Sequence, residues 1–346
     1  MNILSIESSC DETACAIVKD GTEILAHVVA SSKDFHEKTG GVVPEVAARK
    51  QLEFIVPVIE QTLTEFYGDS IRKKRETKSG KGIDAIAVTV GPGLIGSLIV
   101  GIEAAKVLAF AWEKPLIPVN HLLGHIYANF IQEKGEKPKI IDFPSIALLV
   151  SGGHTDLILM HGHGDFEYIG GTLDDAAGEA FDKTARLLGL VKYLGGPLLS
   201  QKAAECTNNT ISGKLPRPMI NENNFDFSFS GLKTAVKRLV ENNNYPVDVV
   251  SCEFENAVCD VLVEKTIKAV KKYKVTSLLL GGGVAANRQL RKRLENKANN
   301  LSVKFYVPPI ELCTDNAVYI ASVAYFNYKP KKIEEIIADP SLGIMD

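Results

Sequence analysis

The sequence of 346 residues lacks the patterns of several common protein classes. Its six cysteines form no C-x-x-C pair and no ladder of short spacings, which argues against a disulfide framework and a zinc finger and predicts a reducing compartment. No run approaches 18 uncharged apolar residues, and no basic stretch with a long apolar stretch follows Met1. We therefore expect a cytoplasmic protein that neither crosses nor binds a membrane. The net charge of −3 excludes bulk affinity for nucleic acid but leaves room for a local basic patch.

Three enzyme motifs are also missing. The sequence contains no G-x-x-x-x-G-K-[ST], which excludes a P-loop, and no G-x-S-x-G elbow of a serine hydrolase. The metalloprotease motif H-E-x-x-H fails because Leu122 stands where the glutamate would be. Residues 91–96 match G-x-G-x-x-G after a predicted strand. The acid Glu113 precedes the next strand rather than ending it, which argues against a dinucleotide site.

The predicted elements occur in the same order twice. Each half begins with three strands joined by turns, followed by helical sequence. An apolar strand, a glycine turn, a helix and a further strand come next. The predicted strands cover residues 2–7, 14–18, 22–30, 84–90, 115–119, 145–150, 156–160, 166–169, 275–280 and 303–307; the predicted helices cover 45–66, 94–112, 174–190, 197–206, 230–243, 253–273, 285–297 and 315–325.

This repeat predicts a duplicated α/β fold with two similar lobes facing a cleft, as in the actin, hexokinase and Hsp70 (ASKHA) group. The expected N-terminal lobe covers residues 1–120. The expected C-terminal lobe, with helical insertions, covers 121–314. The last stretch, 315–346, is expected to pack back on the first lobe.

Two histidines at a four-residue spacing, His121 and His125, form the most informative pair. On a helix this spacing puts both imidazoles on one face, within reach of one metal ion. Asn120 is the candidate N-cap of that helix. Asp315, far along the chain, is either the N-cap of a later helix or a third, oxygen ligand. Two imidazoles and a carboxylate with open positions suit Fe(II) or Zn(II).

Glycine turns follow three apolar stretches, at 91–93, 151–153 and 281–283. Glycine lets backbone amides approach an anion closely, so three such turns at matching places in the repeat favour nucleotide binding over simple chain reversal. Asp11 and Glu12, in the first turn, could face a phosphate or a divalent cation, and a simple chain reversal at Asp11 is equally open. Three acids share one predicted helical face and are either solvated or close to a ligand's ribose: Asp175, Glu179 and Asp182.

Residues 71–81 contain six basic residues and one acid. A solvated loop and a contact with a phosphate backbone are both open interpretations of such a run. A second basic face is expected on the helix that carries Arg288, Arg291, Lys292 and Arg293.

At these residues the sequence resembles the TsaD/Gcp/Kae family, the tRNA N6-adenosine threonylcarbamoyltransferases. The resemblance covers nearly the whole chain in order. It rests on IESSCDET (6–13), GGVVPEVA (40–47), GPGLIG (91–96), NHLLGH (120–125), LVSGGHT (149–155), GEAFDKT (178–184), FSFSGLKTAV (227–236), GGGVAANR (281–288) and CTDNA (313–317). Two departures stand out: the basic stretch 71–81 is longer than usual, and Gln51 replaces a frequent histidine.

The resemblance implies a set of site residues. His121, His125 and Asp315 would be the metal ligands, for one Fe(II) or Zn(II) ion per subunit. Ser151, Gly152, Gly153 and Asp11 would be catalytic. The substrate-binding residues would be Leu149, Val150, Ser151, Gly152, Gly153, Asp182, Gly195 and Asn287, the last three holding the adenylate.

It also implies a reaction and partners. Threonylcarbamoyl-AMP would donate its acyl group to N6 of the adenosine 3′ of the anticodon, in tRNAs that read ANN codons, and Mg(II) could accompany the nucleotide. A bacterial member would act with a paralogous TsaB-like subunit and a TsaE-like ATPase. Two alternatives remain at this point: a two-lobed ATP-binding partner protein without transferase activity, and a metallopeptidase.

Overall fold

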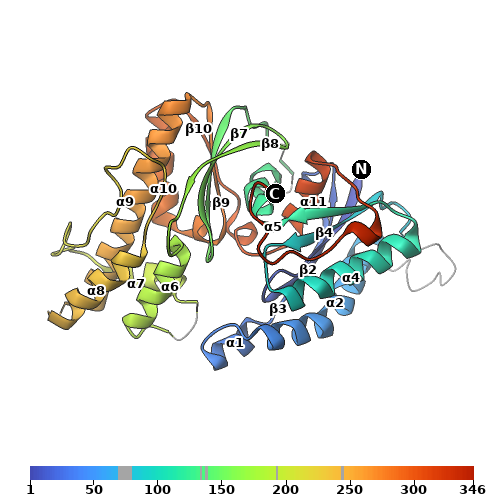
Figure 1. The fold of residues 1–346 in the computed structure, drawn as a ribbon, viewed down its shortest axis with the longest axis horizontal. Helices are drawn as coiled ribbons and strands as arrows, with labels where there is room; N and C mark the ends of the chain where they lie inside the picture. Colours follow the sequence, from blue (N-terminus) through green and yellow to red (C-terminus); the bar gives the residue numbers. More distant parts are fainter. Residues whose placement is uncertain (69–79, 133–134, 137–138, 192–193, 243–244) are drawn as a thin grey trace. The chain divides into compact units, whose positions relative to one another are not determined.

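The computed structural model describes residues 1–68, 80–132, 135–136, 139–191, 194–242 and 245–346. The chain divides into two compact units (Figure 1). Unit 1 comprises Met1–Ile141 and Thr314–Asp346, and unit 2 comprises Asp142–Cys313. Each unit contains a five-stranded mixed sheet, and each is described by itself below.

The sheet of unit 1 has the strand order β3-β2-β1-β4-β5. The first three strands pair antiparallel, whereas β1, β4 and β5 run parallel. The carboxyl ends of the three parallel strands therefore meet at one edge, together with the turn between β1 and β2. The strands are β1 (Asn2–Glu7), β2 (Glu12–Lys19), β3 (Glu23–Ser31), β4 (Ala85–Gly91) and β5 (Leu116–Asn120).

Helices cover both faces of this sheet. Leu4 and Ile6 point to the side where α2 and α4 pack, and Ser5 points to the other side and donates a hydrogen bond to the Ala317 carbonyl before α11. This follows from the alternation of side chains along a strand. The helices of unit 1 are α1 (Lys33–Thr39), α2 (Pro44–Tyr67), α4 (Ile95–Trp112), α5 (His121–Tyr127) and α11 (Val318–Phe326), with 3₁₀ turns η1 (Ala128–Phe130) and η4 (Ile333–Glu335).

Helix α4 is long and apolar enough, by length and composition alone, to span a membrane, although it is not a run of uncharged residues. It nevertheless carries Glu103 and Lys106, which form an ion pair. Its face with Leu98, Ile102 and Ala105 is buried against β4 and α2 (Figure 1). This face belongs to the core of unit 1.

The sheet of unit 2 repeats the topology of unit 1, with the order β10-β9-β6-β7-β8. Strands β6, β7 and β8 pair antiparallel, and β6, β9 and β10 run parallel. The repeat predicted from the sequence is therefore confirmed strand by strand. The strands are β6 (Ser145–Val150), β7 (Thr155–Gly162), β8 (Asp165–Gly171), β9 (Ser277–Gly281) and β10 (Lys304–Tyr306).

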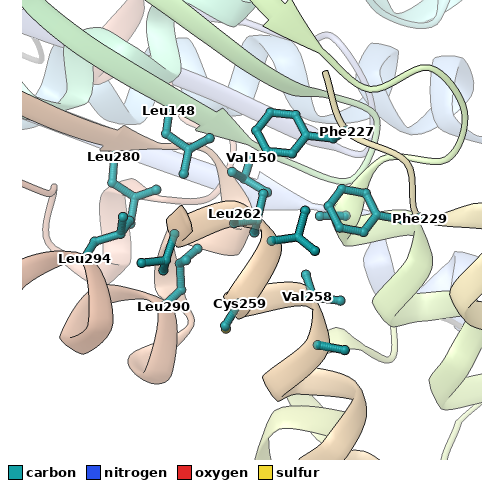
Figure 2. Packing of buried hydrophobic residues seen from close by; sticks show 14 of the residues in the cluster. Leu148, Val150, Phe227, Phe229, Val258, Cys259, Leu262, Leu280, Leu290 and Leu294 are labelled. Atoms are coloured by element: carbon teal, nitrogen blue, oxygen red, sulfur yellow. The ribbon is translucent and has the colours of Figure 1, made fainter. Parts of the chain in front are cut away.

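The core of unit 2 lies between this sheet and the long helix α9. Figure 2 shows Leu148 and Val150 of β6 facing Leu262 of α9, with Phe227 and Phe229 beside them. The two phenylalanine rings stack with centroids 6.2 Å apart. The helices are α6 (Ala177–Leu187), α7 (Gly196–Glu205), α8 (Ser230–Asn242), α9 (Val247–Tyr273) and α10 (Arg288–Asn299), with 3₁₀ turns η2 (Gly283–Ala286) and η3 (Ile310–Leu312).

The boundary between the units differs from the expected one. The sequence suggested a first boundary after residue 120, but the structure places it after Ile141. The reason is that α5 packs on α11 and on the ends of β4 and β5, all in unit 1. A Cβ added at Gly124 of α5 would lie 2.4 Å from the Tyr319 ring of α11, so the two helices are in close contact.

Candidate metal centre and substrate loop

The two histidines follow β5 directly, at the carboxyl edge of the unit 1 sheet. Asn120 ends the strand, and its side chain accepts a hydrogen bond from the Leu122 amide, which confirms the predicted N-cap. Helix α5 begins at His121, so His121 and His125 lie one turn apart, with ring centroids separated by 4.7 Å. Both rings are buried, with exposed fractions of 8% and 3%.

Asp315 reaches the same place from the other end of the chain. Its Oδ1 lies 3.6 Å from His121 Nε2 and 3.4 Å from His125 Nε2. Asp315 does not cap α11, because Asn316 Oδ1 accepts from the Val318 and Tyr319 amides instead. The carboxylate is therefore available to face the imidazoles. All three residues belong to unit 1.

This group fits one divalent ion. The ligand atoms lie within 4.8 Å of one another. Ligands bound about 2.1 Å from a tetrahedral ion would be separated by about 3.4 Å, close to the observed nitrogen-to-oxygen distances. Two imidazoles and a carboxylate form a borderline donor set, which suits Zn(II) and Fe(II) better than Mg(II).

Buried charges surround the group. Burial would lower the pKa of His121, but the charges of Glu7 and Asp315 raise it to about 9. Burial raises the pKa of Asp315 to about 6 against the opposing charge of His121. Glu12 has a pKa raised to about 10, by burial and by the charges of Asp315 and Asp11. Acids thus outnumber cations here, and a bound metal ion would compensate them.

The loop 151–153 connects β6 and β7 in unit 2. It is closed by hydrogen bonds from the Ser151 amide to the His154 carbonyl and from the His154 amide to Ser151 Oγ. The amides of Gly152 and Gly153 donate to no acceptor among the described residues, and both glycines are exposed. A Cβ on either would meet nothing within 4 Å. Two free amides are therefore presented to solvent.

Two other glycines, Gly178 and Gly282, contact the backbone of this loop and of the strand before it. The Gly178 amide, at the start of α6, donates to the Ser151 carbonyl, and a Cβ at Gly178 would lie 2.4 Å from that oxygen. Gly282, after β9, has a φ of +91°, and a Cβ there would lie 2.3 Å from the Val150 carbonyl. Only glycine permits both contacts. The loop is therefore packed on its inner side and open on its outer side.

The three residues expected to hold an adenylate come together around α7. Asp182 Oδ1 accepts from the Gly196 amide at 2.8 Å, and Gly195 precedes this residue as the N-cap of α7. Asn287 caps α10, and its side-chain nitrogen donates to Ser200 Oγ of α7 and to Glu255 of α9. The other two acids of the predicted helical face do not join them: Asp175 and Glu179 pair with Lys183.

Comparisons with known proteins agree with this arrangement. A model of the family described as TsaD, tRNA N6-adenosine threonylcarbamoyltransferase, matches residues 23–322. The chain belongs to this family. It is 51% identical to the tRNA N6-adenosine threonylcarbamoyltransferase of Bacillus subtilis over 329 residues, which cover 93% of this chain and 89% of the relative. It is 49% identical to the protein of that name from Dehalococcoides mccartyi strain CBDB1, with 99% of both chains covered.

Solved structures support the fold. HypF of T. kodakarensis matches with a TM-score of 0.61 at 14% identity, over 97% of this chain and 48% of that one. This likeness places the TsaD-family chain in the two-lobed α/β group expected from the sequence. Membership in the family supports threonylcarbamoyl transfer to N6 of a tRNA adenosine, and the alternatives of a non-catalytic ATP-binding partner and a metallopeptidase are not favoured.

One glycine turn of this TsaD-family chain is closed by the protein itself. A Cβ at Gly91 would lie 1.9 Å from the Asp339 carbonyl, and the Gly93 amide donates to the Pro340 carbonyl. The turn 91–93 therefore receives the C-terminal segment rather than a phosphate. The matching turn 281–283 supports the loop 151–153 through Gly282. The turn 151–153 presents two exposed glycine amides with no acceptor among the described residues, and the turn 281–283 adds one at the exposed Gly283.

Sequence reasoning missed Glu7 and Tyr319. Glu7 hydrogen-bonds His121, and the Tyr319 hydroxyl lies 3.4 Å from Asp315 Oδ1. The signal for Glu7 was available, since a carboxylate at the end of an apolar strand needs a partner when buried. Asp11 is buried beside the group, where its charge raises the pKa of Asp315. The basic residues 71–79 lie outside the described residues, and Arg291 and Arg293 form hydrogen bonds or ion pairs within unit 2.

Proposed function

We propose that this protein transfers the threonylcarbamoyl group of threonylcarbamoyl-AMP to N6 of the adenosine 3′ of the anticodon, in tRNAs that read ANN codons. The observation that carries the proposal is the convergence of His121, His125 and Asp315 in a chain whose family is named for this transfer. A partner protein without catalysis would have no need for two buried imidazoles that converge on one carboxylate.

In this proposal unit 1 holds the metal. His121 and His125 bind one divalent ion through their Nε2 atoms and Asp315 binds it through Oδ1, and either Zn(II) or Fe(II) satisfies this donor set. A bound ion would supply a Lewis acid for a phosphoryl or carbonyl oxygen. Asp11 stands at the same sheet edge and adds negative charge beside the group.

Unit 2 holds the donor. Threonylcarbamoyl-AMP is a mixed anhydride, already activated toward an amine, so the enzyme needs no nucleophile of its own and acts by positioning. The free amides of Gly152 and Gly153 are suited to an anionic oxygen, either the phosphate or the oxyanion that develops on the carbonyl. Ser151 fixes the loop through its hydroxyl, and Leu149 and Val150 anchor it in β6.

The adenylate part is assigned to the start of α7. Asp182 and Gly195 lie at the N-terminus of this helix, where the Gly196 amide holds the Asp182 carboxylate, and a carboxylate can accept hydrogen bonds from the ribose hydroxyls of the adenylate. Asn287 contributes indirectly, by positioning Ser200 and Glu255, because its side-chain nitrogen donates hydrogen bonds to both. A Mg(II) ion with the nucleotide, a paralogous TsaB-like subunit, a TsaE-like ATPase and a cytoplasmic location complete the proposal.

The experiment is reconstitution of the modification. Purified protein, loaded separately with Fe(II) or Zn(II), is incubated with synthetic threonylcarbamoyl-AMP and unmodified tRNA, with and without the two partner proteins. Nucleoside mass spectrometry should detect threonylcarbamoyladenosine only at the adenosine 3′ of the anticodon. If the Bacillus subtilis relative yields the product under the same conditions and this protein does not, the proposal is wrong.

A further inference from the structure

Glu7 is a carboxylate with no exposed surface, at the end of β1. Three donors converge on it. The Ser9 amide donates to Oε1 at 2.6 Å, the Thr89 hydroxyl donates to Oε2 at 2.6 Å, and His121 Nδ1 lies 2.9 Å from Oε2. The donors come from the β1–β2 turn, from β4 and from α5. The carboxylate is therefore fixed from three sides at the edge where the parallel strands end.

The contact with His121 decides which ring nitrogen faces the metal group. Nδ1 points to Glu7, with Ser9 Oγ also 3.4 Å away, and Nε2 points to Asp315. A carboxylate can only accept from Nδ1, so the hydrogen of the neutral ring must reside there. The lone pair of Nε2 is then left for the group that His125 and Asp315 complete.

We propose that Glu7 is a positioning residue of the metal centre, which sets the ring orientation and the tautomer of His121, and that Thr89 in turn orients Glu7. The inference rests on the proposed function, because it assumes that His121, His125 and Asp315 bind a metal ion. Glu7 itself stays outside the ligand set, since its two oxygens are occupied by the three donors.

The substitution Glu7→Gln tests this with almost no change in volume. Three donors face the carboxylate, and a glutamine replaces one acceptor oxygen by a donor. If the amide nitrogen of the glutamine faces Thr89 and His121, the imidazole loses its acceptor. If it faces the Ser9 amide instead, two donors meet and the β1–β2 turn is displaced. We expect metal affinity to fall about 10- to 100-fold, the usual effect of removing such a partner.

A pair of variants at Thr89 separates positioning from stability. Thr89→Ser keeps the hydroxyl that donates to Glu7 and should retain wild-type affinity. Thr89→Val keeps the shape of the side chain but loses the donor, and should weaken metal binding by a smaller factor than Glu7→Gln. The matched control is Glu253→Gln in unit 2, because Glu253 is equally buried and accepts from the Gly213 and Leu215 amides and from Arg217. That variant should leave the affinity unchanged.

The readout is Zn(II) affinity, measured by competition with a chromophoric chelator, together with the visible spectrum of the Co(II)-loaded protein. Long-range proton–nitrogen NMR of the metal-free protein at a pH above 9, where the His121 ring is neutral, reports the tautomer directly. Wild type should show the hydrogen on Nδ1 of His121, and Glu7→Gln should show a mixture or the other tautomer.

Two results are decisive. If Glu7→Gln weakens Zn(II) binding and changes the tautomer while Glu253→Gln does neither, the inference is supported. If folded Glu7→Gln and Thr89→Val both bind Zn(II) within twofold of wild type with unchanged tautomer, the inference is overturned. In that case His125→Ala distinguishes a failure of this inference from a failure of the proposed function. If His125→Ala no longer binds Zn(II), the metal centre stands and only the role of Glu7 is wrong. If His125→Ala still binds Zn(II), the metal part of the proposed function is wrong as well.

Discussion

The two units have the same sheet but opposite chemistry at its equivalent edge. In unit 1, the turn after β1 and the ends of β4 and β5 bring together buried acids and two imidazoles. In unit 2, the turn after β6 presents free backbone amides and no charged side chain between Ser151 and Gly153. The first edge suits a cation and the second suits an anion.

This difference shows that the sheet topology sets where a site can form, and that the residue types at that edge decide which ligand it can bind. Carboxyl ends of parallel strands meet at one edge in both units, so either edge could have carried a site. Two of the glycine turns differ as well. Gly91 and Gly93 of unit 1 are in close contact with the protein's own chain, whereas Gly152 and Gly153 of unit 2 leave space open.

The largest effect is expected from removing a ligand in unit 1. His125→Ala should lower metal affinity by more than about 100-fold, beyond the range for outer-shell groups, because a direct donor is lost. Elemental analysis after gel filtration measures the metal-to-protein ratio. The control is His161→Ala, on the exposed end of β7 in unit 2. Equal ratios in wild type and His125→Ala would break the assignment of the cation to unit 1.

The next effect tests the open loop of unit 2. Gly152→Val should abolish tRNA modification through loss of donor binding, since its side chain would occupy the space in front of the free amides. The melting temperature should stay within a few degrees, because Gly152 is exposed and a Cβ there would meet nothing within 4 Å. Gly162→Val, at the far end of β7 and equally open, is the matched control. If Gly152→Val modifies tRNA normally, the donor does not lie against this loop.

A third prediction contrasts a packed glycine with an open one. Gly124→Ala puts a Cβ 2.4 Å from the Tyr319 ring, so it should destabilise the protein by about 1–3 kcal/mol through overpacking. Gly152→Ala should change stability by less than about 0.5 kcal/mol. Thermal or denaturant unfolding of the two variants measures the difference. Similar losses in both would show that the loop of unit 2 is not open on its outer side.

The smallest effect concerns a buried acid of unit 2 that faces no imidazole. Burial raises the pKa of Asp156 to about 6, and its hydrogen-bond partner is the Tyr168 hydroxyl. Because the folded-state pKa lies above the unfolded value near 3.8, this group contributes stability below about pH 4 and loses it as the pH rises through 6. Asp156→Asn should therefore stabilise the protein at pH 8 by about 1–2 kcal/mol and have little effect at pH 4.

The comparison of unfolding at the two pH values is the test. A gain that is the same at pH 4 and pH 8 would mean that Asp156 does not titrate in this range. Glu167→Gln, an exposed position on the neighbouring strand β8, serves as the control.

Several features could be predicted because they depend on local sequence. The strands Asn2–Glu7 and Ser145–Val150 were predicted to the residue, since apolar stretches between turn residues leave little choice. The cap at Asn120 and the one-turn spacing of His121 and His125 follow from helix geometry alone. Helix α1 was missed, because its seven residues carry no apolar periodicity.

The sequence by itself determined the duplicated fold, the imidazole pair and the glycine turns, because each is set by residues close together in the chain. Only the tertiary structure decided which distant residues contact these features. Packing of α5 against α11 brings Asp315 to the histidines and moves them into unit 1. The C-terminal segment closes one glycine turn, and Gly178 and Gly282 hold another open. Most of these contacts join residues over a hundred positions apart, and no local pattern specifies them because they arise from the fit of already formed elements.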